Sequence, residues 1–130
     1  FEKYMSLVRD EGYHEQVYIL AGVMPVRSVK ALLYMKESVP GVSIADEYIK
    51  RMESAGSDKE KVAAEGVAMC IEIMQQVKAI EGVRGIHIMP VMWESVTPRL
   101  VEGAGLLPRP QPRPEPEPEP SAETALSSAS

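Results

Sequence analysis

This sequence of 130 residues has little of what most catalytic signatures are made from. It contains one cysteine, two histidines and one tryptophan. It has no glycine-rich dinucleotide fingerprint, no phosphate-binding P-loop, no nucleophile elbow, and no His-x-x-x-His or Cys-x-x-Cys pair with the spacing of metal ligands. Metal-dependent catalysis and covalent nucleophilic catalysis therefore have little support in the sequence.

The charge and the lack of long apolar runs exclude further classes of protein. A nucleic-acid surface needs a basic face, whereas the formal net charge is -5. No run of eighteen apolar residues occurs, and the N-terminal segment lacks a signal-peptide core, so we expect no membrane span. Cys70 cannot form an internal disulfide and lies in an apolar helical stripe, which predicts a buried, reduced thiol in a cytoplasmic protein.

Two apolar segments predict buried strands. The first covers residues 17–20 and runs into a corner that ends at Pro25, and the second covers residues 85–91 and contains Pro90. Helical sequence separates them, which favours parallel pairing in an α/β sheet covered on both faces. Because chemistry in such folds gathers where strands end and helices begin, we expect the functional site at that edge.

Three helices are predicted from capping and terminating residues. The first includes residue 1 and ends at Gly12. Ser28 caps the second, which ends at Pro40. Thr97 caps the third, a short helix that ends near residue 105.

Two more helices are predicted from capping-box spacing. Ser43, with an acidic residue three positions later, opens a short helix that ends at Gly56. Ser57, with a glutamate three positions later, opens the clearest helix, which Gly82 closes. Its predicted buried face consists of Val62, Gly66, Met69, Cys70, Ile73, Val77 and Ile80.

The polar residues near the strands are weak candidates for a site. His14 precedes the first strand, and we expect it in a solvated loop. His87 faces away from its two isoleucine neighbours, so it either lines a site or makes a structural hydrogen bond. Trp93 either stacks on a flat heterocycle or packs a loop on the rim. Glu94 is interpreted as a solvated loop acid.

The composition changes abruptly at Pro108. From there proline recurs at every second position, and glutamates alternate with it over residues 115–120, so we predict a disordered tail over residues 108–130. A docking motif for a proline-binding module is the alternative. Residues 1–107 are few for a closed α/β domain and begin at Phe1, so we expect the C-terminal portion of a longer protein, unable to fold stably alone.

Three blocks resemble the last third of the methylenetetrahydrofolate reductase family in their order and spacing. They are Ile-Leu-Ala-Gly-Val-Met-Pro-Val at 19–26, Glu-Gly-Val-Ala-Met at 65–69 and Glu-Gly-Val-Arg-Gly-Ile-His-Ile at 81–88. The resemblance covers roughly residues 1–107. It implies an α/β fold that forms the C-terminal part of a (β/α)8 TIM barrel, namely its last two strands with their helices.

The resemblance also implies a chemistry. Members of the family reduce 5,10-methylenetetrahydrofolate to 5-methyltetrahydrofolate in one-carbon metabolism, with FAD as cofactor. We therefore expect a folate substrate, an electron donor that is NAD(P)H or a redox partner subunit, and an oligomer. The family's acid and most of its FAD contacts belong to earlier strands, so no catalytic residue is assigned here and we expect no activity from this chain alone.

The resemblance places a substrate-binding wall at Met24, Met35, Val91 and Trp93. In the NADH-using members a glutamine and a phenylalanine occupy the positions of Ala31 and Met35, and a leucine and an arginine those of Val91 and Trp93. Losing the charged and hydrogen-bonding groups disfavours direct use of NADH.

Two alternatives remain open. In the first, the chain is a non-catalytic barrel subunit that recruits an electron-transfer or methyl-transfer partner. In the second, it belongs to an unrelated (β/α) barrel enzyme whose corner matches by chance, since a fold does not specify one function.

Overall fold

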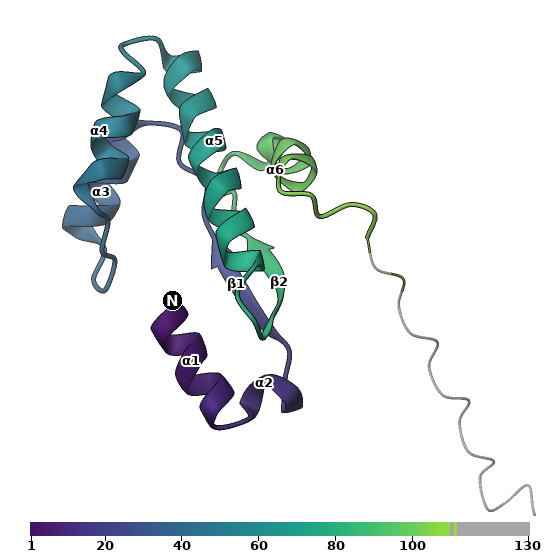
Figure 1. Cartoon of the computed structure of the whole chain (residues 1–130). Coiled ribbons are helices and arrows are strands. Elements are labelled where there is room, and N and C mark those ends of the chain that lie inside the picture. Colours follow the sequence, from purple (N-terminus) through teal and green to yellow (C-terminus); the bar gives the residue numbers. More distant parts are fainter. Residues whose placement is uncertain (110, 112–130) are drawn as a thin grey trace, which may run out of the picture.

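The computed structural model describes residues 1–109 and 111 and contains a two-stranded parallel sheet flanked by helices (Figure 1). In chain order the elements are α1 (Glu2–Asp10), α2 (Tyr13–Gln16), β1 (Ile19–Val23), α3 (Val29–Ser38), α4 (Asp46–Ser54), α5 (Lys59–Lys78), β2 (Val83–Ile88), the 3-10 helix η1 (Glu94–Val96) and α6 (Thr97–Gly103). The predicted α/β class is therefore observed. The predicted disordered tail falls mainly on residues outside the described ones.

The two strands pair in parallel, as predicted, but their bounds differ from the prediction. β1 begins at Ile19 and not at Val17 as predicted. Val17 and Tyr18 are largely exposed and do not pair with β2. β2 spans residues 83–88 and ends before Pro90, which has no N–H to donate to a ladder. One further backbone bond, from the N–H of Met89 to the carbonyl of Val23 at 2.9 Å, extends the pairing towards the predicted site edge.

Only one face of the sheet is covered within the described residues. Val23 and Ile88 face the helices α5 and α6, and Val23 is buried there. Leu20 and His87 lie on the opposite face, and 60% of the Leu20 surface is exposed. The expectation of cover on both faces is therefore not met by this part of the chain.

The capping residues agree with the prediction at α3 but not at α6. Ser28 caps α3, because its Oγ accepts the backbone N–H of Ala31 at 3.1 Å. Thr97 is the first residue of α6 rather than its cap, since η1 leads directly into this helix. Gly12 and Gly82 adopt left-handed φ angles of 72° and 92° where helical segments stop, as predicted.

The two predicted capping boxes are wrong. Ala45, not Ser43, precedes the first residue of α4, and no side chain caps that helix. Asp58, not Ser57, caps α5, since its carboxylate accepts the N–H of Glu60 at 2.9 Å. A carboxylate gains both a hydrogen bond and the attraction of the helix dipole, which favours it over the neighbouring serine.

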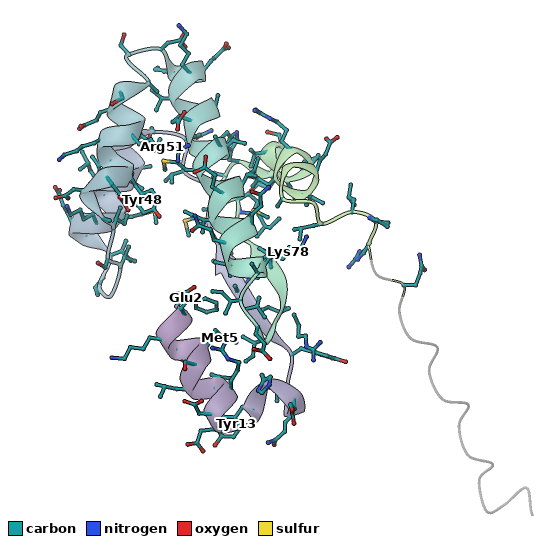
Figure 2. The ribbon with its side chains drawn as sticks, in the orientation of Figure 1. Glu2, Met5, Tyr13, Tyr48, Arg51 and Lys78 are labelled. Carbon is teal, nitrogen blue, oxygen red and sulfur yellow. The ribbon has the colours of Figure 1, made fainter. Side chains whose placement is uncertain are left out.

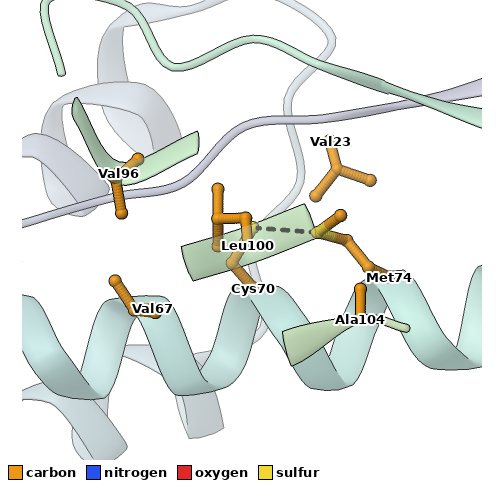
Figure 3. Close-up of a cluster of buried hydrophobic side chains, with 7 residues drawn as sticks. All are labelled: Val23, Val67, Cys70, Met74, Val96, Leu100 and Ala104. Carbon is orange, nitrogen blue, oxygen red and sulfur yellow. Dashed lines mark hydrogen bonds between the residues drawn. The ribbon is translucent and has the colours of Figure 1, made fainter. Parts of the chain in front are cut away.

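Helix α5 lies between α4 and α6 and supplies residues to two hydrophobic clusters (Figure 1). The main cluster joins α5 to the sheet, η1 and α6, and consists of Val23, Val67, Cys70, Met74, Val96, Leu100 and Ala104 (Figure 3). The second cluster joins α5 to α3 and α4, and consists of Leu32, Ile49, Met52, Val62 and Met69.

The buried face of α5 is broader than the sequence predicted. Val67 and Met74, which the prediction left out, are buried in the main cluster. Ile73, Val77 and Ile80, which it included, are only half-buried. The other four predicted residues are buried. The difference arises because α5 packs against elements on two sides, so its apolar stripe widens beyond a single line of contacts.

Ion pairs join α4 to α5 on the surface. Arg51 belongs to α4 and is labelled in Figure 2. Its guanidinium donates to both carboxylate oxygens of Glu72, at 2.5 and 2.7 Å, and also to Glu65. These contacts raise the pKa of Arg51 and lower the pKa of Glu72 through their hydrogen bonds. The pairs are partly exposed, so we assign them a positioning role rather than a large share of stability.

None of the helices in the described residues is long and apolar enough to cross a membrane.

Cys70 is a buried core thiol, as predicted. Its side chain is 3% exposed, and its Sγ lies 4.0 Å from the Sδ of Met74 (Figure 3). Burial in this apolar setting disfavours the thiolate and raises the pKa of Cys70 to about 11, from an ordinary value of 9.0.

This shift predicts a loss of stability at alkaline pH. Between about pH 7.5 and pH 10.5 the unfolded thiol loses its proton while the folded thiol keeps it, so the free energy of unfolding falls as the pH rises. We expect the wild type to lose about 2 kcal/mol more than the Cys70→Ala variant over this interval. Urea unfolding of both proteins at the two pH values measures the difference, because the two proteins differ only at residue 70. Equal losses would contradict the prediction.

Candidate functional site

The carboxyl ends of the two strands and one face of α3 enclose a groove of about 250 Å3, the corner groove. Three segments line it: residues 24–27 after β1, residues 91–93 after β2, and the helix positions Ala31, Tyr34 and Met35. The groove therefore lies at the edge of the sheet where strands end and helices begin, which is where the sequence analysis expected a site.

The structure brings all four predicted wall residues together in the corner groove. Met24 follows β1, Met35 comes from the second turn of α3, and Val91 and Trp93 follow β2. Ala31 also lines the groove, because residues four apart share one face of a helix. That these side chains contact a ligand stays a prediction.

The groove is suited to a flat, mainly apolar ring. Methionine thioethers are polarizable and pack against aromatic rings, and the Trp93 indole offers a flat face. Among the described residues that line it, Arg27 is the only charged side chain, and no carboxylate or imidazole takes part. The arrangement can bind and orient a ring and exclude water from one side, but it provides no acid or base.

Arg27, Tyr34 and Met92 line the groove but were not predicted as site residues from the sequence. Arg27 and Tyr34 carried a usable signal, since the first lies inside the corner itself and the second next to a predicted wall residue on α3. Met92 carried none, because methionine does not indicate an unusual backbone. Its φ angle is 56°, in the left-handed region that non-glycine residues rarely adopt. It lies in a tight turn closed by the N–H of Trp93 and the carbonyl of Pro90 at 2.8 Å.

The polar candidates near the strands lie outside the groove. Glu94 is exposed, as expected, although it begins η1 rather than a loop. His87 is exposed on the open face of the sheet, paired with Gly22. The prediction for His14 is wrong: it lies in α2, and its Nδ1 is buried without a hydrogen-bond partner in the described part of the chain. The helix packs closely there because Gly82 has no side chain.

A ring-sized groove at the carboxyl edge of parallel strands is typical of α/β ligand-binding and catalytic domains. The family model described as Methylenetetrahydrofolate reductase matches residues 1–105. The chain therefore belongs to the methylenetetrahydrofolate reductase family. A comparison with curated proteins gives no match.

Membership in this family has two consequences. It suggests an oxidoreductase that acts in folate-related reduction, in a family that is generally flavin-dependent. It also excludes the alternative of an unrelated barrel enzyme with a chance match at the corner.

The groove residues fit a flat ring but not the whole of FAD. The diphosphate of FAD requires several backbone N–H donors or cations. The corner groove presents a single cation, Arg27, and the Oγ of Ser28 already accepts the N–H of Ala31 at the start of α3. In the part of the chain that the structure describes, no group of three histidine, cysteine or acidic residues can hold a metal ion.

Proposed function

We propose that this chain forms one wall of the folate pocket in an enzyme that reduces 5,10-methylenetetrahydrofolate to 5-methyltetrahydrofolate with the help of FAD. One observation carries the proposal: Met24, Met35, Val91 and Trp93 converge from three segments on one ring-sized groove, in a chain that belongs to the family. When bound, FAD supplies the two-electron chemistry. The chain's own residues bind and orient the folate ring and exclude water.

The groove also bears on the electron donor. Ala31 and Met35 offer no polar side chain to a nicotinamide amide, and Trp93 offers an indole rather than a charge. We therefore propose that electrons arrive through a redox partner subunit rather than by direct binding of NAD(P)H in this groove. A cytoplasmic location and an oligomer stay predictions from the sequence analysis.

We propose further that β1 and β2 are the last two strands of a (β/α)8 barrel. In such a barrel the helices cover the outer face, and side chains from other strands fill the interior. The coverage of the two-stranded sheet on one face, with Leu20 and His87 on the open face, supports this arrangement. Residues 1–107 are then the C-terminal portion of the reductase domain.

A second candidate function has support in the same groove. A non-catalytic barrel subunit that recruits an electron-transfer or methyl-transfer partner needs no acid or base, and none lines the groove. The side chains of Val91 and Met92 are 68% and 79% exposed at its rim, where a partner can reach them.

The two functions can be separated by the visible absorbance of the natural protein, purified together with any cofactor and partner that it carries. We expect an oxidised flavin spectrum that bleaches when 5-methyltetrahydrofolate is added without oxygen. With Trp93→Leu, which keeps an apolar side chain but removes the flat ring, the folate concentration needed for half-bleaching should rise about tenfold.

The matched control is Tyr18→Leu, which removes an exposed ring outside the groove and should leave the midpoint unchanged. Equal midpoints for Trp93→Leu and the wild type would contradict the role of the indole. A colourless protein that cannot be reconstituted with FAD would favour the non-catalytic subunit.

A further inference from the structure

The two sides of the corner groove belong to different packed units. Residues 91–93 follow β2, and Trp93 packs against the main cluster. Ala31, Tyr34 and Met35 come from α3, which packs against α4, and α4 in turn packs against α5. The width of the groove therefore depends on where α3 and α4 together lie relative to α5 and the sheet.

The pair of helices α3 and α4 joins the rest of the fold through two short connections. The first is the corner at residues 24–28, and the second is the segment 55–58. In the second connection Gly56 has a φ angle of 89°, and no described atom lies within 4 Å of the place where its Cβ would stand. Between α4 and α5 the second cluster supplies apolar contacts, which are non-directional and resist separation of the helices more than sliding.

Arg51 supplies a directional contact between α4 and α5. It donates to Glu65 and, bidentately, to Glu72, and these two carboxylates lie two turns apart along α5. A slide of α4 by one turn along α5 would break at least one of these contacts. Lys36 of α3 pairs with Asp46 of α4 at 2.5 Å, so charged contacts connect α3 to α4 and α4 to α5.

On the basis of the proposed function, we propose that Arg51 is a positioning residue for the corner groove. Its contacts hold α4 in register along α5, and α4 holds α3 with its three groove residues. The groove then keeps its width before a ring enters it, which lowers the cost of binding. Arg51 is not among the residues that line the groove, so it acts on the ligand only through α3.

The effect on affinity should be modest and sensitive to salt. The contacts of Arg51 are partly exposed, and dissolved ions screen such pairs. At low salt we expect Arg51→Gln to bind 5-methyltetrahydrofolate about threefold more weakly than the wild type. At high salt the wild type should approach the variant. Calorimetric titration of the natural protein, with any cofactor and partner that it carries, measures both values under conditions in which both proteins are fully folded.

Amide hydrogen exchange reports on α3 without any ligand. At low salt the amides of α3 and α4 should exchange faster in Arg51→Gln, while those of α6 stay unchanged. The charge-swapped variant Arg51→Glu/Glu72→Arg restores one ion pair and should recover part of both effects. The matched control Lys50→Gln removes a neighbouring exposed cation of α4 that forms no ion pair in the described part of the chain, and should change neither.

Each other outcome overturns a defined statement. Unchanged affinity, or unchanged exchange of α3, in Arg51→Gln overturns the positioning role. Faster exchange that includes α6 overturns it as well, because it would indicate a general loss of stability. So does a loss of affinity that persists at high salt or in the charge-swapped variant, since the ion pairs would not be its cause. If the wild type binds no folate, the proposed function fails, and the exchange of α3 alone decides whether Arg51 positions this helix.

Discussion

Replacing Gly66 with alanine is expected to lower the free energy of unfolding by about 3 kcal/mol or more. A Cβ atom at this position would lie 1.8 Å from the carbonyl oxygen of Val26, a backbone atom that cannot turn away. Helix propensity alone favours alanine over glycine by about 1 kcal/mol, so the predicted sign is opposite to the intrinsic preference. Because Val26 lies within the corner that lines the groove, ligand affinity should fall as well.

Denaturant unfolding of the purified protein checks this expectation, with Gly103→Ala as the matched control. The added Cβ at Gly103 would lie 2.4 Å from the Cδ1 of Ile71, the far end of a flexible side chain that can change rotamer. We expect that variant to lose less than about 1 kcal/mol. Similar midpoints for both variants would show that the α5 backbone can move away from the corner.

Replacing Leu100 with alanine is expected to cost about 3 kcal/mol. The side chain is 0% exposed and lies in the main cluster, where α6 packs against α5 (Figure 3). Truncation removes apolar contacts and leaves a cavity that a close-packed interior fills only in part. Trp93 packs against the same cluster, so a loosened α6 should also weaken the wall of the corner groove.

The matched control is Leu107→Ala, which makes the same chemical change at a side chain that is 62% exposed. We expect a change within about 0.5 kcal/mol for it. Chemical unfolding of the two variants, with the Trp93 environment followed by fluorescence, measures both effects. A small loss for Leu100→Ala would mean that α6 contributes little to the fold.

The sequence by itself determined the α/β class of the fold and predicted the edge of the sheet at which the corner groove lies. Continuous apolar runs predicted two parallel strands, and helical spacing with Ser28 as a cap predicted the helix after the first corner. The burial of Cys70 followed from its place in an apolar stripe. The position of the wall at Met24, Met35, Val91 and Trp93 came from the resemblance to the family, because no local pattern marks an apolar residue as a binding residue.

Only the tertiary structure decided which neighbours each residue meets. Periodicity gives the direction of a buried face but not its width, so Val67 and Met74 became core residues only because α5 has neighbours on two sides. His14 is half-buried because a chain segment remote in sequence packs against it at Gly82.

Long-range packing also completes the site. Arg27 and Trp93 come from corners that follow different strands, and parallel pairing brings those corners to the same edge of the sheet. The sequence determined each corner through local interactions. Their meeting depends on a strand pairing between residues more than sixty positions apart, which no local pattern specifies.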